Sequence, residues 1–306
     1  MTSRPILIAR ARFPGDAFAR AEALFDVRIS GGPLRDACLR GEYADAAAIW
    51  RFGERVDAEL LDALPALRAV GNEGVGFDTI DREALDRRGI VLCIPRSQNA
   101  DAVADHAMAL LLAVRHQVVA GDRFVREGRW GGRGTEEPQG LDITGSTLGI
   151  VGLGHIGRAV ARRGEAFGMR VVGWNRTPRL ETGIEHLPLD DLLAQSDHVS
   201  LHCALADQTR GLIGERALSL MRPTAILINT ARGAIVDQDA LIAALQGDRL
   251  WGAGLDVFPQ EPQVDPRLLE HPRVVVTPHI ADNQPSVYGA LTEAVVAGLE
   301  AVFAPR

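Results

Sequence analysis

Three polar residues, Arg232, Glu261 and His279, each lie shortly after an apolar run that is typical of a buried strand. Ligands of open α/β sheets bind beyond the carboxyl ends of the strands, so these side chains can converge on one crevice although they are far apart in the sequence. Arg232 offers a planar fork that can hold a carboxylate and polarise the adjacent carbonyl. His279, with an ordinary pKa of about 6.5, can protonate an oxygen that becomes a hydroxyl, and Glu261 would favour the imidazolium and orient the ring. Together they suit hydride addition to a 2-oxo acid, although each residue alone is at least as typical of a surface position.

A glycine-rich segment, Gly152–Gly157, precedes these residues with the spacing GxGxxG. The chain holds 32 glycines, so the spacing alone is a weak signal. An apolar strand pattern ends just before it and a helical pattern follows, and in that context the glycines permit a tight turn, close approach to a pyrophosphate and close packing of helix on strand. The N–H groups at the helix N-terminus would then attract the phosphates. The sequence therefore predicts a dinucleotide-binding turn, with a glycine-rich turn that binds nothing as the alternative.

The residues that would face the adenosine ribose follow the next strand pattern. An NAD-binding turn of this type carries an Asp or Glu about 20 residues after the glycines, where it accepts hydrogen bonds from the ribose hydroxyls. Here Asn175, Arg176 and Thr177 stand at that point. A carboxylate would repel a 2′-phosphate, whereas this set offers a cation and neutral donors. The sequence therefore predicts NADP(H) as the preferred cofactor, with NAD(H) equally accepted if Arg176 only lies over the adenine.

The elements that must position these residues form two series of alternating strand and helix patterns. Apolar runs typical of strands occupy 5–9, 27–30, 46–50, 67–70 and 90–94, and then 147–151, 171–174, 198–203, 225–230, 252–257 and 274–277. Helical patterns occupy 56–64, 80–88, 157–167, 237–246 and 285–303. Strands that alternate with helices predict parallel sheets covered on both faces. Asp237 or a neighbour is expected to cap the helix that follows it.

The segment 99–119 is apolar nearly all round and predicts one long helix. Such a helix is expected to be buried between domains or against a second subunit, with an ordinary core helix as the alternative. His106 and His116 lie in this segment and are more typical of helix or interface positions than of metal ligands. No group of His, Cys, Asp and Glu in the sequence has the spacing of a metal site, so no metal is predicted.

The composition excludes several classes of protein. The chain has 306 residues, of which 46% are hydrophobic, and a net charge of −7. This fits about two domains of roughly 150 residues each. The acidic balance argues against a nucleic-acid binder, and no run of about 18 apolar residues predicts a membrane span. The apolar stretch in residues 1–9 is too short for a signal peptide, and the three scattered cysteines form no CxxC pair, so reduced thiols and a cytoplasmic location are expected.

Five segments together resemble the D-isomer-specific 2-hydroxyacid dehydrogenase family, which includes glyoxylate/hydroxypyruvate reductases and phosphoglycerate dehydrogenases. They are 148–157, 201–214, 229–237, 254–262 and 277–281, and the resemblance covers nearly the whole chain. It implies that Arg232 binds and polarises the substrate and that Glu261 and His279 form the acid/base pair. It also implies that Asp256 holds the nicotinamide amide.

The cofactor contacts expected on this basis are Gly152, Gly154, His155, Ile156, Gly157, Asn175, Arg176, Thr177, His202, Cys203, Thr230, Ala231, Asp256 and His279. Of these, His155 is more typical of a solvent-facing position in the turn, and His202 is equally typical of a packed core histidine.

The resemblance also implies how the chain is divided. Residues 1–97 together with 285–306 would form a discontinuous substrate-binding domain, and residues 98–284 a nucleotide-binding Rossmann domain. The expected fold is therefore α/β, with two Rossmann-like or flavodoxin-like domains, parallel sheets and an interdomain cleft. Members of the family are commonly homodimers joined through the nucleotide-binding domains, so the same assembly is expected here.

A loop in the first domain, Asn72–Asp78, is similar to the family's substrate loop. Gly74, Val75 and Gly76 are expected to present backbone N–H groups to the substrate carboxylate, because glycines let the backbone point at an anion; a plain strand-to-helix turn is the alternative. Arg51 lies where some relatives carry a substrate-site arginine, and a solvent-facing arginine is the equal alternative. Segments 93–97 and 281–285 depart from the family's usual pattern, so the resemblance predicts the reaction class but not the individual substrate.

The sequence therefore predicts NAD(P)H-dependent reduction of a small 2-oxo acid, of the glyoxylate or hydroxypyruvate type, to the D-2-hydroxy acid. The proton would come from His279. One alternative is a dehydrogenase of another small anion such as phosphite. The other is a cofactor-sensing binding protein without catalysis, since some relatives are transcriptional corepressors.

Overall fold

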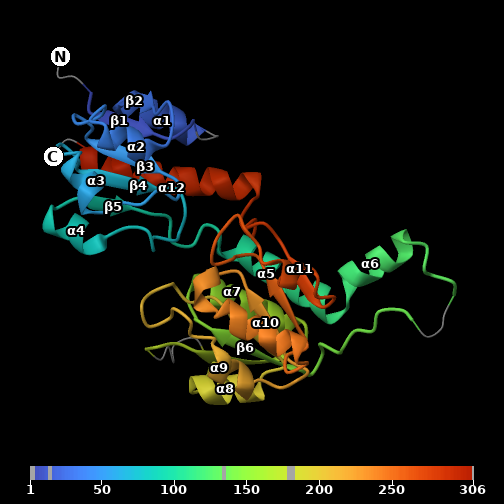
Figure 1. The fold of residues 1–306 in the computed structure, drawn as a ribbon. Coiled ribbons are helices and arrows are strands. Elements are labelled where there is room, and N and C mark those ends of the chain that lie inside the picture. The colour runs from blue at the N-terminus through green and yellow to red at the C-terminus, as the bar shows by residue number, and fades with distance from the viewer. Residues whose placement is uncertain (1–3, 13–15, 133–135, 178–182, 305–306) are drawn as a thin grey trace. The chain divides into compact units, whose positions relative to one another are not determined.

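A computed structural model describes residues 4–12, 16–132, 136–177 and 183–304. The chain divides into two compact units, unit 1 with residues 1–99 and 283–306, and unit 2 with residues 100–282. It leaves unit 1 after residue 99 and returns there for its last helix, which is red in Figure 1. The expected domain limits, 97/98 and 284/285, differ from these by two residues. Residues 1–3, which contributed to the prediction that no signal peptide is present, lie outside the described part.

In the described part of unit 1, five parallel strands form one sheet in the order β2-β1-β3-β4-β5, as in flavodoxin-like folds. The strands are β1 (Ile6–Ala9), β2 (Asp26–Ile29), β3 (Ala48–Arg51), β4 (Ala69–Asn72) and β5 (Val91–Cys93). Successive side chains of a strand point to opposite faces. Leu7 and Ala48 therefore pack with α1 (Asp16–Leu24) and α12 (Pro285–Phe303). Ile8 and Ile49 pack with α2 (Leu34–Leu39), α3 (Ala58–Asp62) and α4 (Arg82–Arg87) on the other face.

In the described part of unit 2, seven parallel strands form one sheet in the order β12-β11-β10-β9-β6-β7-β8. The strands are β6 (Thr147–Val151), β7 (Arg170–Trp174), β8 (Glu185–His186), β9 (His198–Leu201), β10 (Ile226–Asn229), β11 (Gly252–Leu255) and β12 (Val274–Val276). The order reverses between β6 and β9, which is the switch point where Rossmann folds bind dinucleotides. The expected α/β architecture with two parallel sheets is confirmed.

Helices cover both faces of the second sheet (Figure 1). One face carries α5 (Ala100–Arg115) and α7 (His155–Ala166). The other carries α8 (Leu189–Gln195), α9 (Glu215–Leu220) and α10 (Gln238–Gln246), and a short α11 (Pro266–Leu269) precedes β12. The predicted cap at Asp237 is confirmed, because its carboxylate accepts the N–H of Ala240 at 3.1 Å. Strands covered on both faces explain why their sequences are continuous apolar runs.

The expectation of one long helix over 99–119 is wrong. α5 ends at Arg115, and α6 (Val118–Arg126) begins after Gln117, whose φ of 54° is left-handed. The Gln117 side chain donates to the carbonyl of Val114 at 2.9 Å, which satisfies one of the acceptors left at the end of α5. The buried face of α5 packs on β10, β11, β12 and α7 within unit 2. Its apolar residues therefore form an ordinary core face, and their burial does not depend on another domain or subunit.

The last helix, α12, is long and apolar enough by length and composition to cross a membrane, and a third of that window is buried. It packs on β4, β5 and α1 of unit 1. Val295, Val296 and Leu299 form its core face. Its length and hydropathy therefore have a sufficient explanation in the packing of unit 1.

Candidate active site

The side chains of His279 and Glu261 form a hydrogen-bonded pair beyond the ends of β12 and β11. His279 Nδ1 lies 2.8 Å from Glu261 Oε2, and Glu261 Oε1 accepts the N–H of Phe258 at 3.0 Å. The hydrogen bond with Glu261 raises the pKa of His279, although burial and Arg232 oppose it. Burial would raise the pKa of Glu261, but the bonds from His279 and the Phe258 amide lower it overall. The two shifts agree with an imidazolium–carboxylate pair that is open to solvent.

The backbone of His279 is held in a left-handed conformation, with φ of 54°. This conformation costs a residue with a side chain roughly 1–2 kcal/mol, so its surroundings must stabilise it. The His279 N–H donates to the carbonyl of Asp256 at 2.9 Å and to that of Thr277 at 3.1 Å. The conformation turns the chain sharply after β12 and fixes where the imidazole begins.

Asp256, which follows β11, is fully buried and binds the same loop through its carboxylate. Its Oδ1 accepts from the hydroxyl of Thr277 at 2.6 Å and from the N–H of Ile280 at 2.9 Å, and its Oδ2 accepts from the N–H of Ala281 at 3.0 Å. Burial would raise the pKa of Asp256, but these bonds and His106 lower it, so the group is ionised. Asp256 closes the loop that carries His279. The expected contact with a nicotinamide amide stays a prediction.

Arg232 follows β10 at the start of a single helical turn, Gly233–Ile235. The buried side chain of Asn229 fixes this connection, since its amide donates to the Arg232 carbonyl at 3.0 Å and its oxygen accepts the Ala231 N–H at 3.0 Å. A Cβ on Gly233 would lie 2.0 Å from the Phe258 carbonyl carbon, so the connections after β10 and β11 are in direct contact. The charge of Arg232 consequently lowers the pKa values of both Glu261 and His279. The structure thus brings the three predicted strand-end residues together.

The segment after β6 has the geometry of a dinucleotide-binding turn. Gly152 has a left-handed φ of 106°, and a Cβ there would lie 2.5 Å from the amide nitrogen of Cys203. A Cβ on Gly157 would lie 2.0 Å from the Gly152 carbonyl oxygen. α7 begins at His155 after Gly154, which supplies no side-chain cap, so the first N–H groups of the helix are available to an anion. The residues present therefore fit a bound dinucleotide, and His155 is exposed beside Ile156 at this end of the helix.

The residues after β7 divide into one that supports this turn and two that are exposed. Asn175 Oδ1 accepts the N–H of Leu153 at 2.7 Å, so its oxygen is already used to hold the turn. Its Nδ2 is buried without a hydrogen-bond partner among the described residues, which leaves a donor for a ligand. Arg176 and Thr177 are exposed, and Arg176 Nη1 donates to Gln208 Oε1 at 3.1 Å. The supporting bond of Asn175 was not expected from the sequence.

Two further pairs of expected cofactor contacts follow β9 and β10. His202 Nε2 lies 2.8 Å from the hydroxyl of Ser200, and burial lowers its pKa to about 3, so the imidazole is neutral. Burial raises the pKa of Cys203 to about 11, so its thiol is protonated. Thr230 has a buried hydroxyl with no partner among the described residues, and Ala231 beside it is half-buried. These neutral groups suit contact with a nucleotide better than acid/base chemistry.

In unit 1, Arg51 ends β3 and is 2% exposed, so it is not the solvent-facing residue that the sequence left as an alternative. Its Nε and Nη1 are buried without partners among the described residues. The neighbouring loop after β4 is tied down by Asn72, whose amide donates to the carbonyls of Gly74 and Gly76. Val75 lies half-buried between them. Unit 1 therefore places a buried guanidinium on the strand next to a fixed glycine loop, and Glu54 and Asp78 are the acidic groups that act on it.

The structure also identifies supporting residues that sequence reasoning missed, namely Asn72, His106, Asn229 and Thr277. The side chains of Asn72, Asn229 and Thr277 each hold a loop that carries a predicted site residue, and the side chain of His106 contacts Thr277. Among the described residues, no group of three or more His, Cys, Asp or Glu could hold a metal ion.

The sequence model for the NAD-binding domain of D-isomer-specific 2-hydroxyacid dehydrogenases matches residues 108–281. The glyoxylate reductase of Pyrococcus furiosus is 43% identical over 261 residues, which are 83% of this chain and 78% of that protein. The glyoxylate reductase of Pyrococcus horikoshii is 40% identical and covers 97% of this chain and 92% of that protein.

Solved structures of similar proteins agree with these sequence matches. A glyoxylate reductase from Paecilomyes thermophila superposes with a TM-score of 0.91 at 34% identity, over 99% of this chain and 96% of that one. An NADPH-dependent glyoxylate/hydroxypyruvate reductase from Sinorhizobium meliloti, in complex with NADP and malonate, gives 0.91 at 33% identity, over 99% and 94% of the two chains. The chain belongs to the D-isomer-specific 2-hydroxyacid dehydrogenase family.

Proposed function

We propose that the protein reduces a small 2-oxo acid, of the glyoxylate or hydroxypyruvate type, to the D-2-hydroxy acid with a reduced nicotinamide cofactor. The observation that carries the proposal is the His279–Glu261 pair at 2.8 Å with the charge of Arg232 acting on both groups. A raised histidine pKa supplies an acid near neutral pH, and a nearby guanidinium suits a carboxylate and the carbonyl beside it.

The residues divide the chemical work between them. The nicotinamide, when bound, supplies the hydride. Arg232 binds the substrate carboxylate and polarises the carbonyl, so that negative charge on the oxygen is stabilised as it develops. The Nδ1 atom of His279 is bonded to Glu261, so Nε2 is the atom that gives its proton to the oxygen. Glu261 keeps the imidazole protonated and oriented until that transfer.

A panel of 2-oxo acids tests the reaction, with loss of the reduced-nicotinamide absorbance as the readout. We expect turnover with glyoxylate or hydroxypyruvate, and loss of turnover in His279→Ala with cofactor affinity retained. His116→Ala is the matched control, because His116 is exposed directly after α5. Silence with all 2-oxo acids, together with oxidation of phosphite by oxidised cofactor, would favour the alternative substrate. Cofactor binding without any turnover would favour a sensing protein.

We further propose that NADP(H) is preferred over NAD(H). The end of β7 carries Asn175, Arg176 and Thr177 in place of a carboxylate, and Arg176 and Thr177 are exposed there. The relative from Sinorhizobium meliloti is described as NADPH-dependent. We expect kcat/KM to be higher with NADPH, and Arg176→Ala to lower it for NADPH far more than for NADH. Arg170→Ala, at the opposite end of β7, is the control. Equal or better use of NADH by the wild type would contradict the preference.

The groups of unit 1 are proposed to bind the substrate anion. Arg51 is a buried cation with two unpartnered nitrogens, and the fixed loop of Gly74, Val75 and Gly76 lies on the neighbouring strand end. A carboxylate would compensate the guanidinium and accept N–H groups of the loop. Substrate-analogue binding in Arg51→Met, measured by calorimetry, tests this assignment.

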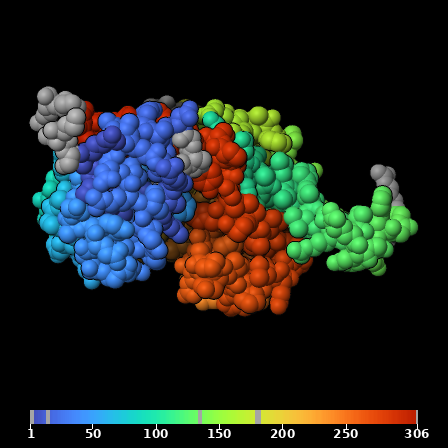
Figure 2. Space-filling model, turned by 90° about the horizontal axis from the view of Figure 1, so that it is seen from above, coloured from blue at the N-terminus to red at the C-terminus, as the bar shows by residue number. Residues whose placement is uncertain are grey.

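A homodimer through unit 2 is proposed as the assembly. α6 and the residues after it, green in Figure 2, stand out from the rest of unit 2. Val118, Val125 and Trp130 are each more than half exposed there, and Phe124 is the one residue within the described helix that is buried. Sedimentation equilibrium should give twice the chain mass, and the pair Val118→Asp and Val125→Asp should give monomers. A monomeric wild type would contradict the proposal.

Three free thiols support a reducing compartment such as the cytoplasm.

A further inference from the structure

A histidine on α5 contacts the loop that carries the acid/base histidine. His106 Nε2 lies 2.9 Å from the hydroxyl oxygen of Thr277 and 3.4 Å from Asp256 Oδ1. Its side chain is 16% exposed, and the Asp256 side chain is fully buried. His106 and Thr277 are 171 residues apart in the sequence, so this contact joins two distant parts of unit 2.

The direction of the hydrogen bonds follows from the atoms available. The Thr277 hydroxyl donates its single proton to Asp256 Oδ1 at 2.6 Å, because an ionised carboxylate is the strongest acceptor within reach. The lone pairs of the Thr277 oxygen must then accept from His106, which requires a proton on His106 Nε2. His106 thereby determines which way the Thr277 hydroxyl points.

The same carboxylate binds the loop on the far side of His279. Asp256 accepts the N–H groups of Ile280 and Ala281, the two residues that follow the left-handed turn. The chain of contacts therefore runs from His106 through the Thr277 hydroxyl, before His279, to Asp256 and on to the amides of Ile280 and Ala281, after His279. A shift of Asp256 would release those amides and the strained turn together.

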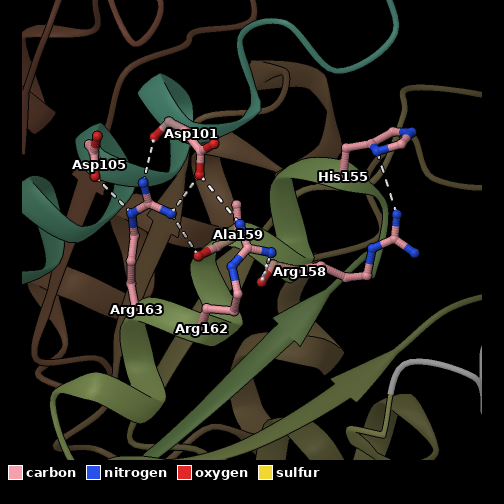
Figure 3. A network of polar contacts seen from close by, with 7 residues as sticks. All are labelled: Asp101, Asp105, His155, Arg158, Ala159, Arg162 and Arg163. Carbon is pink, nitrogen blue, oxygen red and sulfur yellow. Dashed lines mark hydrogen bonds and ion pairs between the residues drawn. The ribbon is translucent and has the colours of Figure 1, made fainter.

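The helix that carries His106 is itself fixed. α5 packs on α7, β10, β11 and β12. On α7, Arg163 donates to Asp105 at 2.7 Å and to Asp101 at 3.1 Å, as Figure 3 shows. His106 adjoins Asp105 in the sequence, so it projects from a helix turn that is attached to the helix of the dinucleotide-binding turn.

We propose that His106 is a positioning residue, which donates through Nε2 to Thr277 and so holds Asp256 and the loop of His279 in the conformation that pairs His279 with Glu261. The kinetic consequence rests on the proposed function, whereas the effect on the imidazole of His279 does not.

The test compares three variants of the full-length protein. His106→Leu removes the donor at similar volume, and His106→Gln keeps an N–H donor close to the position of Nε2. His116→Leu removes an exposed histidine that directly follows the same helix and is the control. One hydrogen bond to this network corresponds to about tenfold in rate, so kcat should fall about tenfold in His106→Leu while KM and the cofactor dissociation constant stay within about twofold. His106→Gln should recover most of the loss.

A second readout does not need turnover. The NMR titration of isotope-labelled histidines should show a lower pKa for His279 in His106→Leu than in the wild type, and His106→Gln should restore it. The charged groups that act on His279 are Glu261, Arg232 and Asp256, and none of them is changed in these variants. A wild type that is inactive on every 2-oxo acid but shows this pattern would refute the proposed function and keep the role of His106.

Three results would overturn the proposal. Wild-type kcat and His279 titration in His106→Leu would show that the contact positions nothing. Equal losses in His106→Leu and His106→Gln would show that the shape of the side chain matters and its donor does not. Should His106→Leu fail to fold by circular dichroism, Thr277→Val and Thr277→Ser decide, since only the second keeps the hydroxyl. Equal behaviour of those two would also refute the relay.

Discussion

Replacement of Glu261 by Gln removes the charge beside His279 while an amide oxygen remains to accept a hydrogen bond from Nδ1. The wild-type contact is 2.8 Å between Nδ1 and Oε2, and it raises the pKa of His279. Opposite charges about 4 Å apart attract by about 1 kcal/mol in water and about 4 kcal/mol at the dielectric typical of a protein surface. The two side chains are 45% and 36% exposed, so solvent screening puts the coupling near the lower limit, at about 1–2 kcal/mol.

The sign of the pH effect follows from the role of His279 as the acid. Reduction needs the imidazolium, so kcat/KM is constant below the pKa of His279 and falls as the pH rises through it. Loss of the Glu261 charge lowers that pKa, so the fall begins at lower pH in Glu261→Gln. The loss relative to wild type is smallest in acid and grows to about five- to thirtyfold above the wild-type pKa, which is what 1–2 kcal/mol corresponds to.

The assay is the pH profile of kcat/KM for 2-oxo acid reduction in the wild type, Glu261→Gln and the control Glu270→Gln. Glu270 is an exposed glutamate at the end of α11 in the same unit. A profile of Glu261→Gln that falls at the wild-type pH, or a loss that is uniform across the pH range, would refute the assignment of Glu261 as the group that keeps His279 protonated.

Three other changes test separate parts of the structure. Gly157→Ala places a Cβ 2.0 Å from the Gly152 carbonyl oxygen; the turn must move, and fluorescence titration should show at least about tenfold weaker cofactor binding, as overpacking by 1–3 kcal/mol predicts. Glu73→Gln keeps hydrogen-bond partners for Trp50 and Thr292 at a position where burial raises the pKa of the carboxyl group. The wild-type fold loses stability as the pH rises through that pKa, so the variant should gain about 1 kcal/mol in free energy of unfolding at pH 8 and nothing in acid. An equal change in Tm at both pH values would contradict this. Arg51→Met should raise KM for the 2-oxo acid about tenfold without a lower Tm, because the variant removes a guanidinium that burial disfavours and whose Nε and Nη1 lack partners; an unchanged KM would remove Arg51 from the substrate site.

The site residues that follow strands were the ones that the sequence could predict. Arg232, Glu261 and His279 stand out because each is a polar residue shortly after an apolar run, and the parallel sheet brings the carboxyl ends of these runs to the same side. The glycine turn was predictable for a similar reason, since its spacing is fixed by local backbone geometry. Each of these patterns lies within a short segment, and the tertiary structure then brings the segments together.

Contacts between distant segments carry no such signal. His106 meets Thr277 across 171 residues, and nothing in the helical pattern distinguishes it from a surface histidine. The break after Arg115 occurs at Gln117, where neither Gly nor Pro marks a turn. The sequence predicts Asn175 as a ribose contact, but its side-chain oxygen accepts the Leu153 N–H, a contact that depends on the pairing of β6 with β7. The two-residue strand β8 was too short for any periodicity to reveal.

We propose above that the residues that follow β10, β11 and β12 reduce a 2-oxo acid. Steady-state oxidation of NADPH with glyoxylate and hydroxypyruvate, run side by side for the wild type and His279→Ala, tests this role. We expect turnover by the wild type, loss of turnover in the variant, and cofactor binding by both. Turnover retained by His279→Ala, or a wild type that binds cofactor yet reduces neither acid, would contradict it.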